Sequence, residues 1–141
     1  MVNIFYEETE ILDEHPEFFM SWLASVCEDE GKVLGDLSLI FTSDEYLLKM
    51  NIEHLNHDYY TDIITFDYSE GRVVSGDLFI SMDRVNENAI DLNVSRETEL
   101  NRVIVHGTLH LIGYSDKSFV EKKVMRDKEN YYLGQIVPRE T

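Results

Sequence analysis

The rest of this sequence can be understood from one stretch, Arg102-Val-Ile-Val-His106-Gly-Thr-Leu-His110-Leu-Ile-Gly113-Tyr-Ser-Asp116. Its two histidines stand four residues apart, a spacing that places both imidazoles on one face of an α-helix, within reach of a single ion. Gly113 is expected to end this helix, because glycine readily takes the backbone conformation that a helix C-terminus commonly needs. Asp116 follows three residues later. The pattern H-x-x-x-H-x-x-G-x-x-D therefore predicts two helical metal ligands, a turn and a third ligand from the loop.

The predicted ligands, His106, His110 and Asp116, favour a single zinc ion. Zn²⁺ accepts two neutral imidazoles and a carboxylate, and no cysteine lies near this stretch. Three protein ligands leave one coordination position open for water, which is typical of catalytic rather than structural zinc sites. Because one ligand is a carboxylate, the metal is expected to be a somewhat weaker Lewis acid than one held by three histidines. The alternative is a pair of core histidines that bond to the backbone, with Asp116 capping the next helix.

The residue after the first histidine separates two classes of reaction. Zinc proteases of the H-E-x-x-H type carry a glutamate there, which acts as the general base. This chain has Gly107 instead, so peptide hydrolysis by the usual route lacks an obvious proton acceptor. The glycine is expected to leave open space beside the metal, for a bulky substrate or for a base supplied by another part of the chain.

Size and charge predict one acidic domain. The 141 residues suffice for a hydrophobic core, and we expect a single domain over residues 1–141 with a loose tail over residues 134–141. The formal net charge of −16 opposes nonspecific binding to nucleic acid or to an anionic membrane, so neither DNA nor a membrane is expected as a partner. Cys27 is the only cysteine and is expected to be an inert core or boundary thiol. With no signal peptide or transmembrane run visible, a cytoplasmic location is expected.

Positive charge is concentrated after the histidine stretch. Five of the twelve basic residues lie there: Lys117, Lys122, Lys123, Arg126 and Lys128. One interpretation is a solvated helix face with ion pairs between residues four apart. The other is a local cationic rim beside the metal.

Hydrophobic patterning predicts a small α+β domain. Strands are expected over residues 2–6, 37–41, 63–66 and 73–81. Helices are expected from Asp13 or Glu14 to Gly31, and over about residues 42–50, 95–113 and 118–133, with a short helix and a loop over 83–93. The order β-α-β-α-β-β-α-α favours a four-stranded mixed sheet, with helices packed around a central, zincin-like helix that bears the metal.

Apolar residues are prominent in three of the expected helices. In the first helix they form a stripe at helical spacing: Phe19, Trp22, Leu23 and Val26. The histidine helix is apolar on more than one side, which is typical of a central, buried helix. The apolar residues of the last helix are Val120, Val124, Tyr131 and Tyr132.

Several motifs together resemble one known family. The segment HGTLHLIGY at residues 106–114 resembles the signature H-G-x-L-H-L-x-G-Y-D-H of the YbeY endoribonucleases, which are rRNA maturation factors. TDIITF at residues 61–66 is similar to the family's T-D-V-L-S-F strand, and GDLFI at residues 76–80 to its G-D-I-x-I strand. Further matches are Met50-Asn51 with the family's L-N, and Met125 and Glu129 with the M and E of its closing helix. The resemblance covers roughly residues 35–133.

The resemblance implies a small α+β metalloprotein with one zinc ion. It also implies endonucleolytic cleavage of single-stranded RNA, in ribosomal RNA maturation (notably at the 3′ end of the small-subunit RNA) and in ribosome quality control. The implied partners are ribosomal RNA, the small ribosomal subunit, one of its proteins and an assembly GTPase. Lys117, Lys122 and Lys123 would then steer the RNA backbone, with binding that weakens as salt rises. No residue can be named as general base.

The chain departs from the family pattern at three positions. Asp116 stands where the family has a third metal-binding histidine, and Ser115 replaces the aspartate before it. Leu55 aligns with a family arginine that is suited to binding phosphate. His54 or His57 could partly replace this arginine, although solvated loop histidines are the simpler interpretation.

Two other functions are consistent with these residues. One is a noncatalytic assembly factor that docks on the ribosome and uses the metal structurally, which the missing arginine and the acidic net charge favour. The other is a zinc peptidase on a shared scaffold, which Gly107 disfavours.

Overall fold

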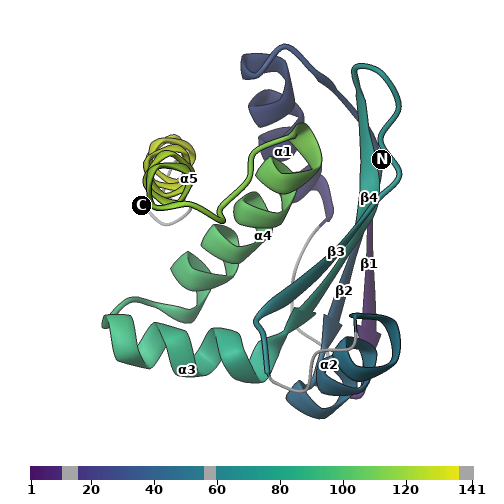
Figure 1. Ribbon diagram of the computed structural model, residues 1–141, viewed down its shortest axis with the longest axis vertical. Coiled ribbons are helices and arrows are strands. Elements are labelled where there is room, and N and C mark those ends of the chain that lie inside the picture. The colour runs from purple at the N-terminus through teal and green to yellow at the C-terminus, as the bar shows by residue number, and fades with distance from the viewer. Residues whose placement is uncertain (11–15, 56–59, 137–141) are drawn as a thin grey trace.

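Four strands form one sheet, and helices cover one of its faces (Figure 1). The computed structural model describes residues 1–10, 16–55 and 60–136. The strands are β1 (Val2–Glu7), β2 (Val33–Thr42), β3 (Ile63–Asp67) and β4 (Val73–Ser81). They lie in the order β1-β2-β4-β3, in which β1, β2 and β4 are parallel and β3 runs antiparallel to β4. The predicted four-stranded mixed sheet is confirmed.

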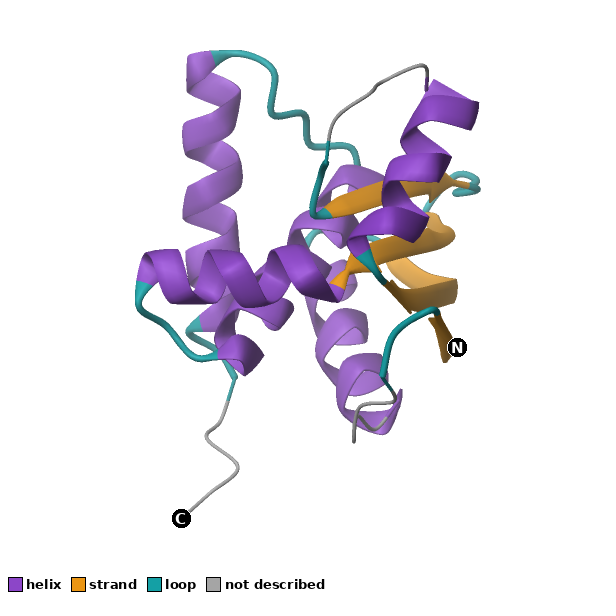
Figure 2. Ribbon diagram, turned by 90° about the horizontal axis from the view of Figure 1, so that it is seen from below, coloured by secondary structure: helices purple, strands orange, loops and turns teal. Residues whose placement is uncertain are grey.

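Five α-helices and one short π-helical segment complete the described structure. They are α1 (Pro16–Asp29), α2 (Asp44–Met50), η1 (the π-helical segment Asn51–Leu55), α3 (Met82–Leu92), α4 (Arg96–Ile112) and α5 (Phe119–Leu133). α4 lies between the sheet and α5, with α1 beside it (Figure 1). Figure 2 shows α5 side-on, away from the sheet. The predicted positions of the helices are confirmed, except that the expected start of the first helix at residues 13–14 lies outside the described residues.

α1 buries the apolar stripe that its sequence predicts. The four residues of the stripe, Phe19, Trp22, Leu23 and Val26, all belong to the main hydrophobic core. Cys27 lies in the same core, and burial raises the pKa of its thiol to about 11. A thiol with so high a pKa is protonated at neutral pH, so the prediction of an inert core cysteine is confirmed.

α4 is the central helix of the domain, as predicted. Ser95 caps its N-terminus by accepting a hydrogen bond from the amide of Thr98. Gly113 ends the helix with a φ of 129°, a conformation that other residues rarely adopt. Between these ends, α4 buries residues on more than one side, among them Leu100, Ile104 and Leu109.

Gly107 lets α4 approach the sheet closely. The residue is buried, and a Cβ atom at this position would come within 2.6 Å of Ile63 Cδ1 and 3.0 Å of Leu78 Cδ2. The prediction that Gly107 leaves open space beside the metal is therefore wrong. The glycine is required because α4 crosses β3 and β4 too closely for a larger side chain, a contact between distant segments that sequence spacing does not show.

Only part of the apolar surface of α5 is buried. The buried residues are Met125, Glu129 and Tyr132. Three of the apolar residues that the sequence marks in this helix are exposed: Val120, Val124 and Tyr131. Polar contacts set the orientation, since the Tyr132 hydroxyl donates a hydrogen bond to Asp29 and Glu129 bonds to α4.

The described chain ends shortly after α5. Of the tail that is expected to be loose, residues 134–136 continue from α5, and residues 137–141 lie outside the described residues. Within the described parts of the chain, no helix combines the length and the apolar character needed to cross a membrane.

Candidate metal centre

The three predicted ligands come together near the C-terminal end of α4. His106 Nε2 and His110 Nε2 are 3.1 Å apart, and Asp116 Oδ2 lies 3.3 Å from the first and 3.4 Å from the second. In a tetrahedral zinc site with bonds of about 2.0–2.1 Å, the ligand atoms are about 3.3 Å apart. The triangle therefore has the dimensions of one face of such a site, and the donor set fits a zinc ion with one open coordination position.

Each histidine is oriented by a bond at its other ring nitrogen. His110 Nδ1 lies 2.9 Å from the backbone oxygen of Tyr114, and His106 Nδ1 lies 2.6 Å from Glu129 Oε2 on α5. Because a carbonyl oxygen can only accept, His110 carries a proton on Nδ1, and the carboxylate of Glu129 favours the same arrangement at His106. Metal-binding histidines are commonly held in this way. Both imidazoles are thus in the tautomer that binds a metal through Nε2.

Asp116 faces the histidines and does not cap the next helix. The N-cap of α5 is Ser118, whose side chain accepts from the amide of Glu121, while the Glu121 side chain accepts from the amide of Ser118. The alternative in which Asp116 is only a helix cap is therefore wrong. The turn at Gly113 brings Asp116 back to the helix face that carries both histidines.

Negative charge surrounds His106. Burial lowers the pKa of its imidazole, but the hydrogen bond to Glu129 and the charges of Glu129, Asp62 and Asp116 outweigh burial and raise this pKa above its ordinary value. Burial also raises the pKa of the Asp62 carboxyl. The negative potential that stabilises a proton on His106 would equally stabilise a divalent cation, so the local electrostatics favour a metal ion here.

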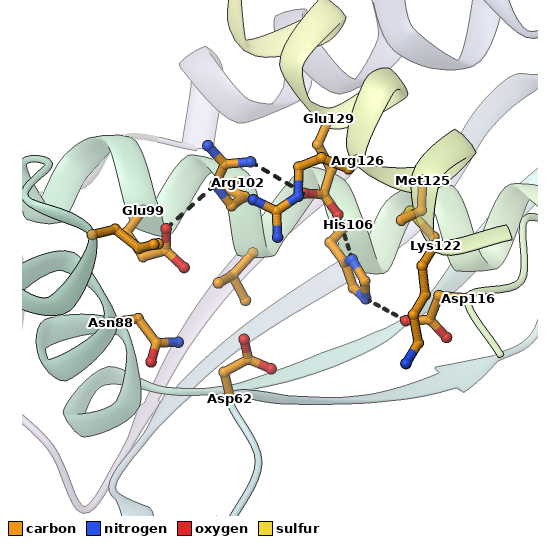
Figure 3. A pocket seen from close by; sticks show the side chains of 12 residues that line it. Asp62, Asn88, Glu99, Arg102, His106, Asp116, Lys122, Met125, Arg126 and Glu129 are labelled. Atoms are coloured by element: carbon orange, nitrogen blue, oxygen red, sulfur yellow. Dashed lines mark hydrogen bonds and ion pairs between the residues drawn. The ribbon is translucent and has the colours of Figure 1, made fainter. Parts of the chain in front are cut away.

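A cavity of about 350 Å³ opens beside His106 and Asp116 (Figure 3). Its lining includes three cationic side chains: Arg102, Lys122 and Arg126. It also includes four carboxylates: Asp62, Glu99, Asp116 and Glu129. A cavity with so many charges suits a charged, polar ligand rather than an apolar one.

Glu129 ties α5 to α4 beside this cavity. Its Oε1 atom lies 3.2 Å from Arg102 Nη1 and 3.7 Å from Arg126 Nε, while Oε2 contacts His106. Arg102 also pairs with the buried Glu99, with 3.4 Å between Nε and Oε1, and burial raises the pKa of the Glu99 carboxyl. Glu129 thus stabilises the packing of two helices and orients a candidate metal ligand at the same time.

The basic residues that the sequence singles out have different surroundings. Lys122 lines the cavity together with His106 and Asp116. Lys123 instead forms an ion pair with Asp127 at 3.0 Å, on an exposed part of α5, as in the interpretation of a solvated helix face. Lys117 is exposed in the turn before α5 and does not line the cavity.

The segment that carries Leu55 does not contribute to the cavity lining. Leu55 and His54 are exposed residues of η1, and neither lines the cavity. The His54 ring contacts the edge of Phe66, with ring centroids 6.3 Å apart. His57 lies outside the described residues. Among the described residues, the cations at the metal-site cavity therefore come from α4 and α5, not from η1.

Sequence spacing assigns no role to four further residues that line the cavity: Asp62, Glu99, Arg102 and Glu129. One signal is present, since Glu99, Arg102 and His106 are three and four residues apart and so lie on one face of α4. The other two are Asp62, just before β3, and Glu129 in α5, and no local spacing connects them with His106.

Comparison with known proteins agrees with this geometry. The sequence model of the family described as Endoribonuclease YbeY matches residues 3–137. This chain belongs to the YbeY family. An endoribonuclease YbeY of Flavobacterium johnsoniae is 50% identical over 136 residues, which cover 96% of this chain and 97% of that relative. An endoribonuclease YbeY of Porphyromonas gingivalis is 52% identical over 120 residues, which cover 85% and 78%.

A solved structure shows the same arrangement of elements. The solution structure of a Thermotoga maritima protein superposes with a TM-score of 0.65 at 27% identity, and the match covers 94% of this chain and 87% of that one. The predicted resemblance to the YbeY family and the predicted α+β fold are both confirmed.

Proposed function

We propose that this chain is a metal-dependent endoribonuclease that cleaves single-stranded RNA. In the cell it acts in ribosomal RNA maturation, at the 3′ end of the small-subunit RNA, and in ribosome quality control. Membership of the YbeY family, and the name endoribonuclease that its relatives carry, support this class of reaction. The observation that carries the proposal is the triangle of ligand atoms from His106, His110 and Asp116 beside a charged cavity.

One zinc ion, held by His106, His110 and Asp116, is the proposed cofactor. When bound, it supplies Lewis-acid chemistry, by polarising a phosphoryl oxygen or by making its bound water more acidic. Glu129 and the backbone oxygen of Tyr114 hold the Nδ1 protons of the two histidines, so both Nε2 atoms remain available as ligands.

Asp62 is the proposed proton acceptor. Gly107 supplies no base on α4, so the base has to come from another element. The Asp62 carboxylate is directed into the cavity, across from the residues of α5 (Figure 3). Burial raises its pKa, which makes it a stronger base at neutral pH than an exposed aspartate. Its backbone is fixed at the sheet, because its oxygen accepts a hydrogen bond from the Ser81 amide at 2.9 Å.

The proposed partners and location follow from this role. RNA is the substrate, and neither DNA nor a membrane is a partner. The small ribosomal subunit, one of its proteins and an assembly GTPase are the proposed binding partners, in the cytoplasm. The chain is proposed to act as one domain over residues 1–141, since α4 packs against both the sheet and α5.

Cleavage by the purified protein tests the proposal. Zinc-loaded protein should cleave a single-stranded RNA that contains the 3′ end of the small-subunit RNA. A chelator should abolish cleavage, and added zinc should restore it. The His110→Ala variant should remain inactive after zinc is added, because one of three ligands is missing. Equal cleavage by untreated protein, chelated protein and His110→Ala would refute the proposal.

The assembly-factor alternative is favoured by the net charge of −16 and by the exposed Leu55 in η1. It predicts a different outcome in a binding experiment with small ribosomal subunits. The wild type and His110→Ala would then bind subunits equally well, while neither would cleave RNA.

A further inference from the structure

Two cationic side chains of α5 point into the cavity beside the metal ligands. Lys122 and Arg126 are four residues apart and so lie on one face of α5, and both line the cavity with His106 and Asp116. In Figure 3 the guanidinium of Arg126 and the ammonium of Lys122 lie on either side of the His106 ring. A ligand bound at His106 would therefore meet a positive charge on both sides.

Neither cation is neutralised by a close partner of its own. Arg126 pairs with Glu129 at 3.7 Å, but Glu129 is held more closely by His106 at 2.6 Å and by Arg102 at 3.2 Å. The Arg126 side chain is 58% exposed, so most of its five N–H donors are available to a ligand. Within the described parts of the chain, no carboxylate oxygen lies within 4.0 Å of the Lys122 ammonium.

A metal ion would reverse the charge balance of the cavity. The four carboxylates of the lining outnumber its three cationic side chains by one. A divalent ion at the three ligands adds two positive charges and leaves the cavity with one net positive charge. The cavity then attracts anions, although the chain as a whole carries −16.

We propose that Lys122 and Arg126 form the subsite that binds backbone phosphates of single-stranded RNA next to the metal ligands. The inference rests on the proposed function, because it takes RNA as the ligand. The guanidinium of Arg126 can bind two oxygens of one phosphate through paired N–H donors, whereas Lys122 acts as a point charge. Arg102, which is engaged by Glu99 and Glu129, holds the helices together behind this subsite.

Binding of a noncleavable RNA tests the subsite without relying on catalysis. The probe is a fluorescein-labelled, single-stranded 2′-O-methyl RNA, whose anisotropy gives Kd for the zinc-loaded protein at several salt concentrations. Arg126→Gln should weaken binding about tenfold and Lys122→Gln about threefold, because a bidentate charged contact is stronger than a point charge. Each substitution should also reduce the slope of log Kd against log salt by about 0.7, the value for one phosphate contact on a single strand.

Two further variants make the test specific. Arg96→Gln is the matched control, because Arg96 lies in the first turn of α4, is 49% exposed and does not line the cavity. It should bind RNA as the wild type does. Arg126→Lys keeps the charge and removes the paired donors, so it should preserve the salt slope while losing part of the affinity. Zinc content and thermal midpoint should be unchanged in all four variants, since the substituted side chains are exposed.

The possible outcomes separate this inference from the proposed function. Wild-type Kd and salt slope in both Arg126→Gln and Lys122→Gln would overturn the subsite, even if the protein cleaves RNA. A wild type that binds the probe through these two residues, yet leaves unmodified RNA intact, would refute the proposed function and leave the subsite standing.

Discussion

Two largely buried carboxylates, Glu129 and Glu30, tie α5 to other elements, but only Glu129 faces the metal centre. Glu129 contacts His106 and Arg102 on α4 and lines the cavity. Glu30, just after α1, does not line it and accepts hydrogen bonds from two tyrosines and a lysine: Tyr114, Tyr132 and Lys128. A glutamate thus holds helices together at both places, and at one of them it also orients a candidate metal ligand.

The two glutamates differ in the side chains that bond to them. Burial raises the pKa of Glu30, but the hydrogen bonds from Tyr114, Tyr132 and Lys128 outweigh burial and lower that pKa below its ordinary value. None of these three residues is among the candidate metal ligands. Glu129 has an imidazole among its partners, and the other nitrogen of that imidazole is a candidate metal ligand. Metal affinity and folding stability should therefore respond differently when each carboxylate is neutralised.

The largest expected effect is the loss of zinc affinity in Glu129→Gln. This substitution removes the negative charge that orients His106, and loss of such a partner typically lowers metal affinity by about 10–100-fold. Competition with a chromophoric zinc chelator measures the change. Zinc affinity equal to that of the wild type would show that His106 needs no carboxylate, and the distinction between the two glutamates would disappear.

Glu30→Gln is the matched variant and should affect stability instead. The amide keeps the shape of the side chain but leaves hydrogen bonds at Tyr132 and Lys128 weakened, at a cost of about 1–3 kcal/mol in the free energy of unfolding. Denaturant unfolding measures this cost, and zinc affinity should stay at the wild-type value. The two sites share Tyr114, whose hydroxyl bonds to Glu30 and whose backbone oxygen accepts from His110. A parallel loss of zinc would show that Glu30 acts on the metal centre through Tyr114.

The smallest expected effect concerns pH: the free energy of unfolding should depend on pH differently in the wild type and in Glu30→Gln. The pKa of Glu30 is lower in the folded chain than its ordinary value of 4.5, so its contribution to stability is present above that value and is lost as the pH falls through the folded-state pKa. In metal-free protein, the free energy of unfolding should therefore fall more steeply below about pH 4.5 for the wild type than for Glu30→Gln. Parallel curves for the two proteins would contradict the account of Glu30.

Local spacing was sufficient to predict that the three candidate metal ligands come together. His106 and His110 are fixed relative to each other by one turn of α4, and the glycine at the end of the helix determines where Asp116 returns. The strands were predictable for a similar reason, because runs of β-branched and aromatic residues bounded by turns form them. In both cases the information lies within a few consecutive residues.

The remaining site residues depend on contacts between distant segments. Glu129 lies 23 residues from His106 in the chain and reaches it only because α5 packs on α4. Asp62 lies at the start of β3 and reaches the cavity through the packing of the sheet against α4. The orientation of α5 likewise depends on distant segments: polar contacts of Glu129 and Tyr132 orient the helix, and they leave Val120 and Val124 exposed.

The zinc content of Asp116 variants tests the central claim most directly. The account predicts one zinc ion per chain in the wild type and in Asp116→His, and a sharp loss of zinc in Asp116→Ala, because the carboxylate supplies one of three ligand atoms. Asp127→Ala is the matched control, since Asp127 is exposed on α5 and does not line the cavity, and it should keep its zinc. Full zinc occupancy in Asp116→Ala would contradict the account.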